Sequence, residues 1–246
     1  MEDSVQQTAD LSDIKALTFD VFGTVVDWRS GIIRDGEALG RAKGLAVDWA
    51  RFAEAWRALY QPALSQVRDG TRPWTKLDDL HRESLERLLV EFGIAGLSEA
   101  EIDALNRAWH RLDPWPDAVA GMTRLRRRYI LATLSNGNVA LLVNMAKRAG
   151  LPWDAVLGAE VARRYKPQNE AYLATAAFLG LRPAQCLMVA AHYNDLVAAA
   201  ACGFRTAYVW RRDEFVVRPK DDLPAVHALD LVVEDFGALA DRLGCV

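Results

Sequence analysis

Short apolar runs alternate with stretches of helical periodicity through the second half of the chain, a pattern typical of α/β proteins. The runs are 129–135, 155–159, 186–190, 205–210 and 230–233, and one more, ALTFDVF (16–22), lies near the start. The helix-periodic stretches between them are 138–149, 168–179, 194–202 and 235–243. Several runs, such as CLMVA (186–190), are apolar throughout rather than alternating, so we expect strands of a parallel sheet that is buried on both faces.

The region between residues 27 and 113 has a different pattern, because it is helix-periodic and contains no convincing strand-like run. Its periodic stretches are 31–44, 47–64, 75–93 and 98–112. Ser98 followed by Glu101 predicts a capping box at the start of the last stretch. The sequence LDPWPD (112–117) marks the return to the α/β pattern.

These patterns predict an α/β fold with a Rossmann-like parallel sheet core, helices on both faces, and an inserted all-helical cap domain. We expect the core to comprise 1–26 and 114–246, and the cap domain to comprise 27–113, inserted after the first strand. The arginine run RLRRRY (124–129) is interpreted as a solvated helix face that precedes a strand.

Composition places the chain among ordinary soluble proteins, with 51% hydrophobic and 26% charged residues. The net charge of −3 gives no general bias toward nucleic acid or an anionic membrane surface. The three cysteines, Cys186, Cys202 and Cys245, have no paired spacing, which favours a reducing compartment over disulfides or a zinc site. The first dozen residues are polar and lack the features of a signal peptide, so we expect a cytoplasmic protein with a short, loosely held N-terminus.

Polar side chains gather where the predicted strands end, which is where ligands bind in open parallel sheets. These residues are Asp20, Thr24, Ser135, Asn136, Lys166, His192, Asn194 and Asp195. Each has a plain alternative on its own: Asp195 could cap the following helix, and Lys166 could be an exposed loop lysine. Their convergence at successive strand ends favours one functional site.

Four segments, in this order, resemble the motifs of the haloacid dehalogenase superfamily, and the resemblance extends over nearly the whole chain. The segments are DVFGT (20–24), LSNGN (134–138), YKP (165–167) and AAHYND (190–195). The phosphatases of that superfamily have a second aspartate, which protonates the leaving group, at the place where this chain has Phe22. Halide leaves without a proton, so the chain is similar to the 2-haloacid dehalogenase (type II) branch. A degenerate phosphatase or a phosphonatase-like enzyme stays open as the alternative.

The resemblance implies that the chain hydrolyses a short 2-haloalkanoic acid, including haloacetate, to the 2-hydroxy acid and halide through a covalent ester on Asp20. Lys166 would keep Asp20 ionised and oriented, and Thr24 would position it. Asp195 would hold or activate the water that cleaves the ester.

The same resemblance assigns residues that bind the substrate and the leaving halide. Ser135 and the backbone amides of Val21 and Phe22 would hold the substrate carboxylate. Arg57, which follows a tryptophan in the predicted cap domain, would receive the halide together with Asn136.

Two further aromatic residues are expected near the site, Trp74 as a pocket-lining residue and Tyr172 close to Lys166. A buried tryptophan of the cap domain is an equal alternative for Trp74. The implied chemistry needs no metal and no cofactor. Its partner is the small-molecule haloacid, with no nucleic acid or membrane, and dimers are common among similar proteins, so the resemblance allows a homodimer.

The last motif departs from the S-x-N-x-x-D pattern of well-known dehalogenases. The serine is replaced by Ala190 and the asparagine by His192, while Asp195 is retained. A neutral His192 could be a hydrogen-bonding partner of Asp20 or of water, and a packed histidine at a strand end is the alternative. This departure leaves the choice of substrate open, fluoroacetate included.

Two other functions fit parts of the pattern. One is another hydrolysis through the same aspartate, such as cleavage of a phosphate ester of a small metabolite. The other is a non-catalytic binding protein with a vestigial site. Asp20, Lys166 and Asp195 argue against the vestigial site, because charges that are costly to bury would not persist without a use.

Overall fold

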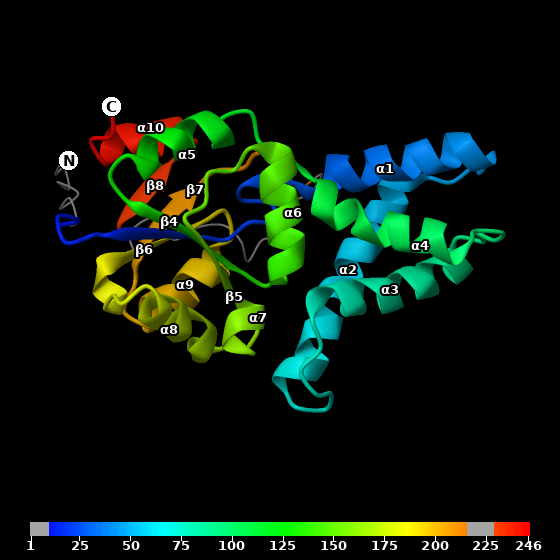
Figure 1. Cartoon of the computed structure of the whole chain (residues 1–246), viewed down its shortest axis with the longest axis horizontal. Coiled ribbons are helices and arrows are strands. Elements are labelled where there is room, and N and C mark those ends of the chain that lie inside the picture. The colour runs from blue at the N-terminus through cyan, green and yellow to red at the C-terminus, as the bar shows by residue number, and fades with distance from the viewer. Residues whose placement is uncertain (1–9, 216–228) are drawn as a thin grey trace, which may run out of the picture.

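Six parallel strands form one central sheet in the computed structural model, which describes residues 10–215 and 229–246. The order across the sheet is β5-β4-β1-β6-β7-β8 (Figure 1). The strands are β1 (Ala16–Phe19), β4 (Ile130–Ser135), β5 (Ala155–Gly158), β6 (Cys186–Ala190), β7 (Arg205–Val209) and β8 (Leu231–Val233). The six strand predictions are confirmed, although the first strand ends at Phe19, so Asp20 opens the following loop.

Helices cover both faces of this sheet, as predicted. They are α5 (Ala118–Arg126), α6 (Val139–Ala149), α7 (Ala159–Ala162), α8 (Asn169–Phe178), α9 (Tyr193–Ala201) and α10 (Phe236–Arg242), with a short 3-10 turn at Pro183–Gln185. Alternate residues of one strand serve opposite faces: Phe19 packs on Phe236 of α10, whereas Ala16 belongs to the core that includes Tyr172 of α8 and Leu196 of α9. The period-2 geometry of a strand therefore yields two apolar cores from one sheet.

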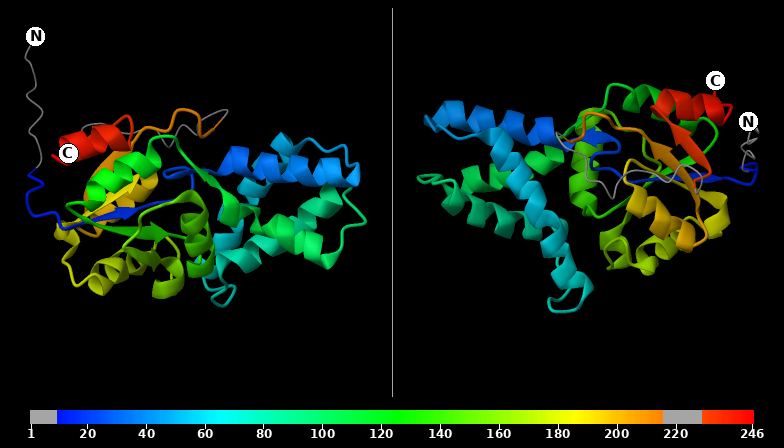
Figure 2. Two further views of the ribbon diagram at one scale, coloured as in Figure 1. Left: turned by 45° about the horizontal axis from the view of Figure 1, so that its top comes forward. Right: turned by 180° about the vertical axis from the view of Figure 1, so that it is seen from behind.

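A group of helices extends to one side of the sheet, and both views of Figure 2 show it as a separate mass. Its members are α1 (Trp28–Lys43), α2 (Trp49–Arg68), α3 (Leu77–Glu91), α4 (Glu99–Asn106) and the 3-10 helix Arg107–Arg111. The chain enters through β2 (Val26–Asp27) and leaves through β3 (Asp113–Pro114), which pair antiparallel. The predicted boundaries at 26/27 and 113/114 fall in this ladder, and the division into two domains there stays a prediction.

The sequence explains how α2 packs against the other helices of this group. Trp49, Phe52, Ala53 and Trp56 recur at helical spacing and are all buried, and the Trp56 ring packs edge-on against Trp109 at 5.5 Å between centroids. The capping box predicted at the start of α4 is present, because Ser98 accepts from the Glu101 amide and Glu101 accepts from the Ser98 amide.

The arginine run at the end of α5 does more than face solvent, because it binds the end of the chain. Arg124 donates to the carbonyl of Cys245, Arg127 donates to the carbonyl of Val246, and Arg128 donates to the carbonyl of Leu243. Guanidinium groups thus satisfy carbonyls after the last turn of α10 that have no helical partner.

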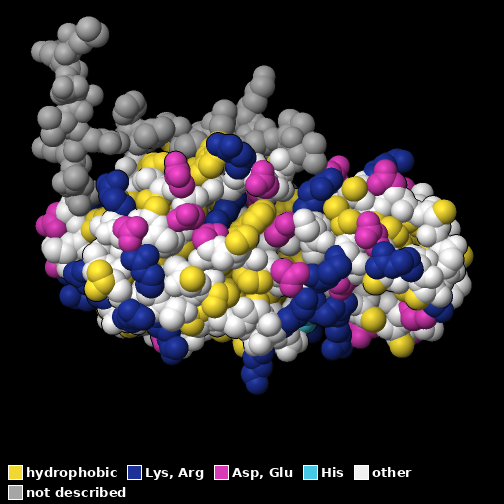
Figure 3. All heavy atoms as spheres, turned by 90° about the horizontal axis from the view of Figure 1, so that it is seen from above, with side chains coloured by type: hydrophobic (Ala, Val, Ile, Leu, Met, Phe, Trp, Pro, Cys, Tyr) yellow, Lys and Arg dark blue, Asp and Glu magenta, His cyan; other side chains and the backbone are white. Residues whose placement is uncertain are grey.

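The surface carries charged side chains of both signs, which Figure 3 shows on one face. In the part of the chain that the structure describes, no helix is long and apolar enough to cross a membrane. The expectation of a loose N-terminus concerns mainly residues 1–9, which lie outside the described residues.

Replacing Ser98 by alanine is expected to lower the free energy of unfolding by about 1 kcal/mol, because the first turn of α4 loses one side-chain acceptor of its capping box. Urea denaturation followed by circular dichroism measures this change. Ser98→Thr is the matched control, since threonine retains the hydroxyl and should keep most of the stability. An alanine variant as stable as the unchanged chain would contradict the capping role.

Candidate active site

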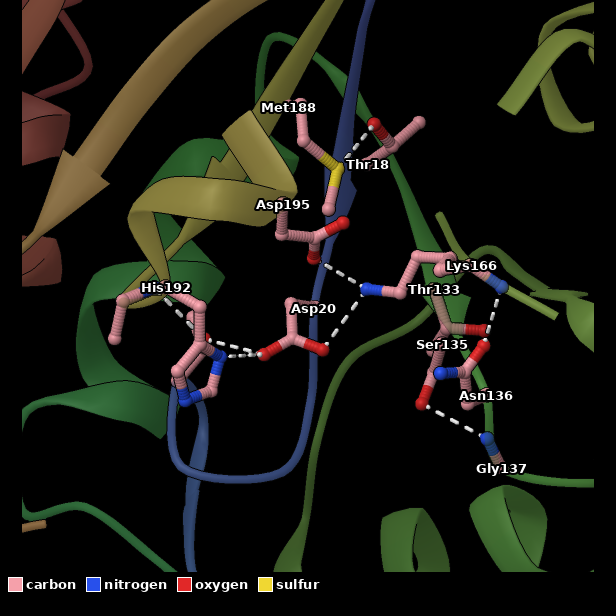
Figure 4. A network of polar contacts seen from close by, with 12 residues as sticks. Thr18, Asp20, Thr133, Ser135, Asn136, Gly137, Lys166, Met188, His192 and Asp195 are labelled. Atoms are coloured by element: carbon pink, nitrogen blue, oxygen red, sulfur yellow. Dashed lines mark hydrogen bonds and ion pairs between the residues drawn. The ribbon is translucent and has the colours of Figure 1, made fainter. Parts of the chain in front are cut away.

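Asp20 lies just beyond β1, buried at 7% exposure, at the carboxyl edge of the sheet. Its Oδ1 is 3.0 Å from Lys166 Nζ, and its Oδ2 accepts from Thr24 Oγ1 at 2.8 Å and lies 3.0 Å from His192 Nδ1 (Figure 4). Thr24 Oγ1 also accepts from the amide of Ala191 at 2.9 Å, which ties the loop after β1 to the end of β6. The carboxylate is therefore fixed by groups from several strand ends.

The charges around Asp20 keep it ionised. Burial by itself raises the pKa of the Asp20 carboxyl, but the Lys166 ammonium and the hydrogen bond from His192 outweigh burial and hold that pKa well below its usual range. Burial likewise lowers the pKa of Lys166, and Asp195 and Asp20 outweigh it and raise that pKa. At neutral pH the site thus contains a carboxylate and an ammonium.

Asp195 is the second carboxylate that Lys166 contacts, at 2.5 Å from Nζ to Oδ2. Its other oxygen, Oδ1, accepts from the Tyr172 hydroxyl at 2.5 Å. Burial raises the pKa of Asp195, and the Lys166 charge opposes that rise only in part. The structure therefore brings Tyr172 to the site through Asp195, close to Lys166 as the sequence predicts.

Asn136 connects the backbone of Lys166 to the helical group. Its Oδ1 accepts from the Lys166 amide at 2.8 Å, and its Nδ2 donates to the Tyr60 hydroxyl of α2 at 2.9 Å. Ser135 is fully buried, and its Oγ accepts from the amide of Gly137 at 3.1 Å, so its own hydroxyl hydrogen is still available to donate.

A cavity of about 490 Å³ opens beside these groups, between α2 and the edge of the sheet. Its lining includes Arg57, Tyr60 and Arg68 from α2, and Asn136, Lys166, Tyr172, His192 and Asp195 from the sheet side. Volumes of this order are usual for small-molecule sites. Six of the predicted site residues thus share one cavity wall, and Asp20 lies behind it.

Arg57 brings a guanidinium group to this cavity from the middle of α2. The guanidinium carbon is 4.4 Å from the centre of the Tyr60 ring and 5.7 Å from that of Trp28. Within residues 10–215 and 229–246, no carboxylate forms an ion pair with Arg57, so its charge is available to an anion in the cavity.

Some residues expected to contact substrate do not line the cavity. Trp74 stacks on Tyr165 at 4.7 Å between ring centroids and lies under the Arg163 guanidinium. Val21 is fully buried, and the Phe22 ring, 5% exposed, packs edge-on against Trp109 at 5.9 Å. Trp74 is only partly buried in this contact, so it does not match the buried alternative, and its role at the pocket stays a prediction.

His192 lies between two carboxylates, which the sequence does not reveal. Its Nδ1 faces Asp20, and its Nε2 is 2.8 Å from Oε1 of Glu214, whose side chain is fully buried. Burial by itself lowers the pKa of His192, but Glu214 and Asp20 outweigh it and raise that pKa well above its ordinary value. Glu214 follows β7 in a loop without any recognisable motif, so no local sequence signal indicates it.

Tyr60, Gln61 and Arg68 are further cavity residues that the sequence interpretation missed. A signal for them exists in the helical spacing. Tyr60 and Gln61 lie three and four residues after Arg57, and Arg68 lies seven residues after Gln61, so all four residues lie on one face of α2. No group of three or more His, Cys, Asp or Glu side chains in the described part of the chain is arranged to hold a metal ion.

Comparisons with known proteins test the family resemblance and the fold. Residues 14–203 match the family of haloacid dehalogenase-like hydrolases. The (S)-2-haloacid dehalogenase of Xanthobacter autotrophicus is 30% identical over 204 residues, which cover 80% of this chain and 76% of that protein. The resemblance inferred from the four motifs is therefore confirmed, as is the fold class.

Solved structures give the same result. The crystal structure of a defluorinating L-2-haloacid dehalogenase is 45% identical, with a TM-score of 0.91 over 94% of this chain and 95% of that one. The structure of the L-2-haloacid dehalogenase of Xanthobacter autotrophicus with chloropropionic acid covalently bound is 25% identical, with a TM-score of 0.78 over 94% of this chain and 98% of that one. The expected homodimer stays a prediction.

Replacing Thr24 by valine is expected to lower kcat/KM for halide release by roughly 10- to 100-fold, since a hydrogen bond to a charged group contributes about 1.5–3 kcal/mol. Valine has nearly the shape of threonine but removes both the donor to Asp20 and the acceptor for the Ala191 amide. Steady-state kinetics on a 2-haloacid measures the effect. Thr24→Ser retains the hydroxyl and should stay within a few-fold of the unchanged enzyme; equal losses in both variants would refute the hydrogen-bonding role.

Proposed function

Because the chain belongs to the haloacid dehalogenase-like hydrolases, we propose that it hydrolyses the carbon–halide bond of a short 2-haloalkanoic acid. The observation that carries this proposal is the pair formed by Asp20 and Phe22. Asp20 is an ionised nucleophile held by Lys166, Thr24 and His192, whereas position 22 offers an aromatic ring packed on Trp109 and no acid for a leaving group. A site of this kind suits a leaving group that departs as an anion.

The first step is attack by an Asp20 carboxylate oxygen on the carbon that bears the halogen. The carbon–halogen bond breaks with inversion, its electron pair leaves with the halide, and an ester of Asp20 forms. The covalently bound chloropropionic acid in the Xanthobacter autotrophicus structure supports an intermediate of this type. Lys166 Nζ contacts Oδ1 of Asp20 and orients the carboxylate before attack.

The substrate carboxylate is proposed to bind Ser135 and the amides of Val21 and Phe22, which are buried near Asp20 behind the cavity wall, so the substrate has to reach past that wall. Among the described residues, Ser135 Oγ has one hydrogen bond, which it accepts from the Gly137 amide, so its hydroxyl hydrogen is available to donate. The departing halide is proposed to move toward Arg57 and the amide group of Asn136, both on the cavity wall. In the second step water cleaves the ester near Asp195 and His192 and restores Asp20.

The product is the 2-hydroxy acid, and no metal or cofactor takes part in the proposed reaction. The names of the relatives indicate the (S)- or L-enantiomer as the substrate, and we extend this preference to the present chain. Cleavage of a phosphate ester is the alternative function.

A direct assay decides between these functions. The purified protein is incubated with (S)-2-chloropropionate, its (R)-enantiomer and chloroacetate, with and without EDTA, and halide release is measured. We expect halide release from (S)-2-chloropropionate and from chloroacetate, and EDTA should not change it. An Asp20→Asn variant whose mass shows no deamidation should release no halide. Magnesium-dependent release of phosphate from simple esters, without halide release, would overturn the proposal.

Replacing Arg57 by glutamine is expected to lower the rate of halide release by roughly 100- to 1,000-fold, because the variant loses a cation that stabilises the developing halide. Arg51→Gln is the matched control, since Arg51 is an exposed arginine on the same helix. The measurement is kcat on 2-chloropropionate for both variants. If the two variants were equally active, Arg57 would have no part in halide stabilisation.

A further inference from the structure

We propose that Glu214 is a positioning residue that makes His192 the base for hydrolysis of the Asp20 ester, an inference that rests on the proposed dehalogenase function. His192 contacts the nucleophilic carboxylate directly, with Nδ1 3.0 Å from Asp20 Oδ2. Glu214 contacts the opposite side of the ring, with Oε1 2.8 Å from Nε2. A carboxylate behind a histidine fixes which ring nitrogen carries hydrogen and which one faces the reaction.

The loop after β1 leaves space for the Glu214 carboxylate beside His192. Gly23, in the loop that follows Asp20, has φ +83°, and a Cβ atom placed on it would lie 1.9 Å from Glu214 Oε1. A residue with a side chain at position 23 would therefore occupy the place of the carboxylate. Arg211 anchors the loop that carries Glu214, because it donates to the carbonyl of Thr24 and forms a bidentate pair with Asp117.

Packing alone does not explain a glutamate at this position. Its side chain is fully buried, and among the described residues its carboxylate has one hydrogen-bonding partner, the imidazole of His192, while Oε2 has none. Burial of a carboxylate costs several kcal/mol before pairing offsets it, so an apolar residue would stabilise the fold at least as well. A negative charge retained under these conditions indicates a role in the reaction.

Asp195 is the alternative base, but each of its two oxygens already accepts a hydrogen bond. Oδ2 accepts from Lys166 and Oδ1 accepts from Tyr172. A proton taken by Asp195 would remove an anionic partner from a buried ammonium. Once Asp20 has become an ester, Nδ1 of His192 no longer faces a carboxylate and can accept a proton.

The charges around His192 couple its protonation to the state of Asp20. With Asp20 free, two carboxylates face the ring, and they hold the pKa of His192 high, so the imidazolium stabilises the nucleophile. Ester formation removes the Asp20 charge and leaves Glu214 as the anionic partner, while the cations Lys166 and Arg57 lie elsewhere on the cavity wall. The pKa of His192 then falls, and a base is created at the stage that needs one.

The protons and charges balance over both steps. After ester formation the Nδ1 proton of His192 leaves to solvent along with the halide ion. Water then attacks the ester carbonyl and loses one proton to Nδ1, while Nε2–H keeps donating to Glu214. The remaining water hydrogen ends on the alcohol oxygen of the 2-hydroxy acid, so that anionic Asp20 and protonated His192 are regenerated together.

Glu214→Gln separates the two steps, because glutamine fills the same space without the charge. In a rapid-quench experiment with (S)-2-chloropropionate we expect the first equivalent of halide to appear within about threefold of the unchanged rate. Formation of the hydroxy acid should slow by roughly 100-fold. Intact-protein mass spectrometry should then detect the accumulated ester. His192→Phe, a second variant that does not depend on the fold tolerating a change at 214, has no base at this position and should also accumulate the ester. Its first step should slow as well, but less than its second, because Asp20 loses the hydrogen bond from His192.

Glu234→Gln is the matched control, since Glu234 is an exposed glutamate, and it should behave as the unchanged enzyme. The pH profile of ester hydrolysis supplies a readout that a purely structural role would not move. Ester hydrolysis should speed up as the pH rises and His192 loses its proton. With one anion fewer beside His192, its pKa is lower in Glu214→Gln, so this acidic limb of the profile should shift to lower pH. Equal slowing of both steps, or no ester in either variant, would overturn the proposal. Absence of halide release from the unchanged enzyme would instead refute the proposed function.

Discussion

One buried ammonium group organises the whole site. Lys166 Nζ lies within hydrogen-bonding distance of both Asp20 and Asp195, and all three side chains are nearly inaccessible to solvent. Two carboxylates this close in a medium of low dielectric constant would otherwise share a proton, because like charges disfavour double ionisation. The lysine charge therefore keeps Asp20 anionic, and a protonated Asp20 could not act as a nucleophile.

The position of this ammonium depends in turn on the helices beyond the sheet. Asn136 accepts from the Lys166 amide and donates to Tyr60 of α2, and Arg68 of α2 donates to the Lys166 carbonyl at 3.1 Å. The loop that carries the lysine is thus held between the sheet and α2. The same helix supplies Arg57, so one element both steadies the charged centre and provides the cation expected to meet the halide.

Much of this arrangement could be predicted from the sequence, because parallel strands bring their carboxyl ends to one edge. The strand runs placed Asp20, Asn136, Lys166 and Asp195 together, and helical periodicity identified α1 to α4. Trp74 was harder to place, since an aromatic residue near a motif has no fixed direction until its neighbours are known. Glu214 could not be found at all, because its relation to His192 depends on how a loop far along the chain passes over Gly23.

The two-residue ladder between β2 and β3 has a bearing on how such an enzyme could diversify. The chain enters the helical segment at Val26–Asp27 and leaves it beside the same point at Asp113–Pro114, so the ends of that segment are neighbours. A segment whose ends already meet can be lengthened, exchanged or lost with little extra loop-closure entropy for the rest of the fold. Substrate range could thus evolve by exchange of this segment, while the sheet that holds the nucleophile is inherited unchanged.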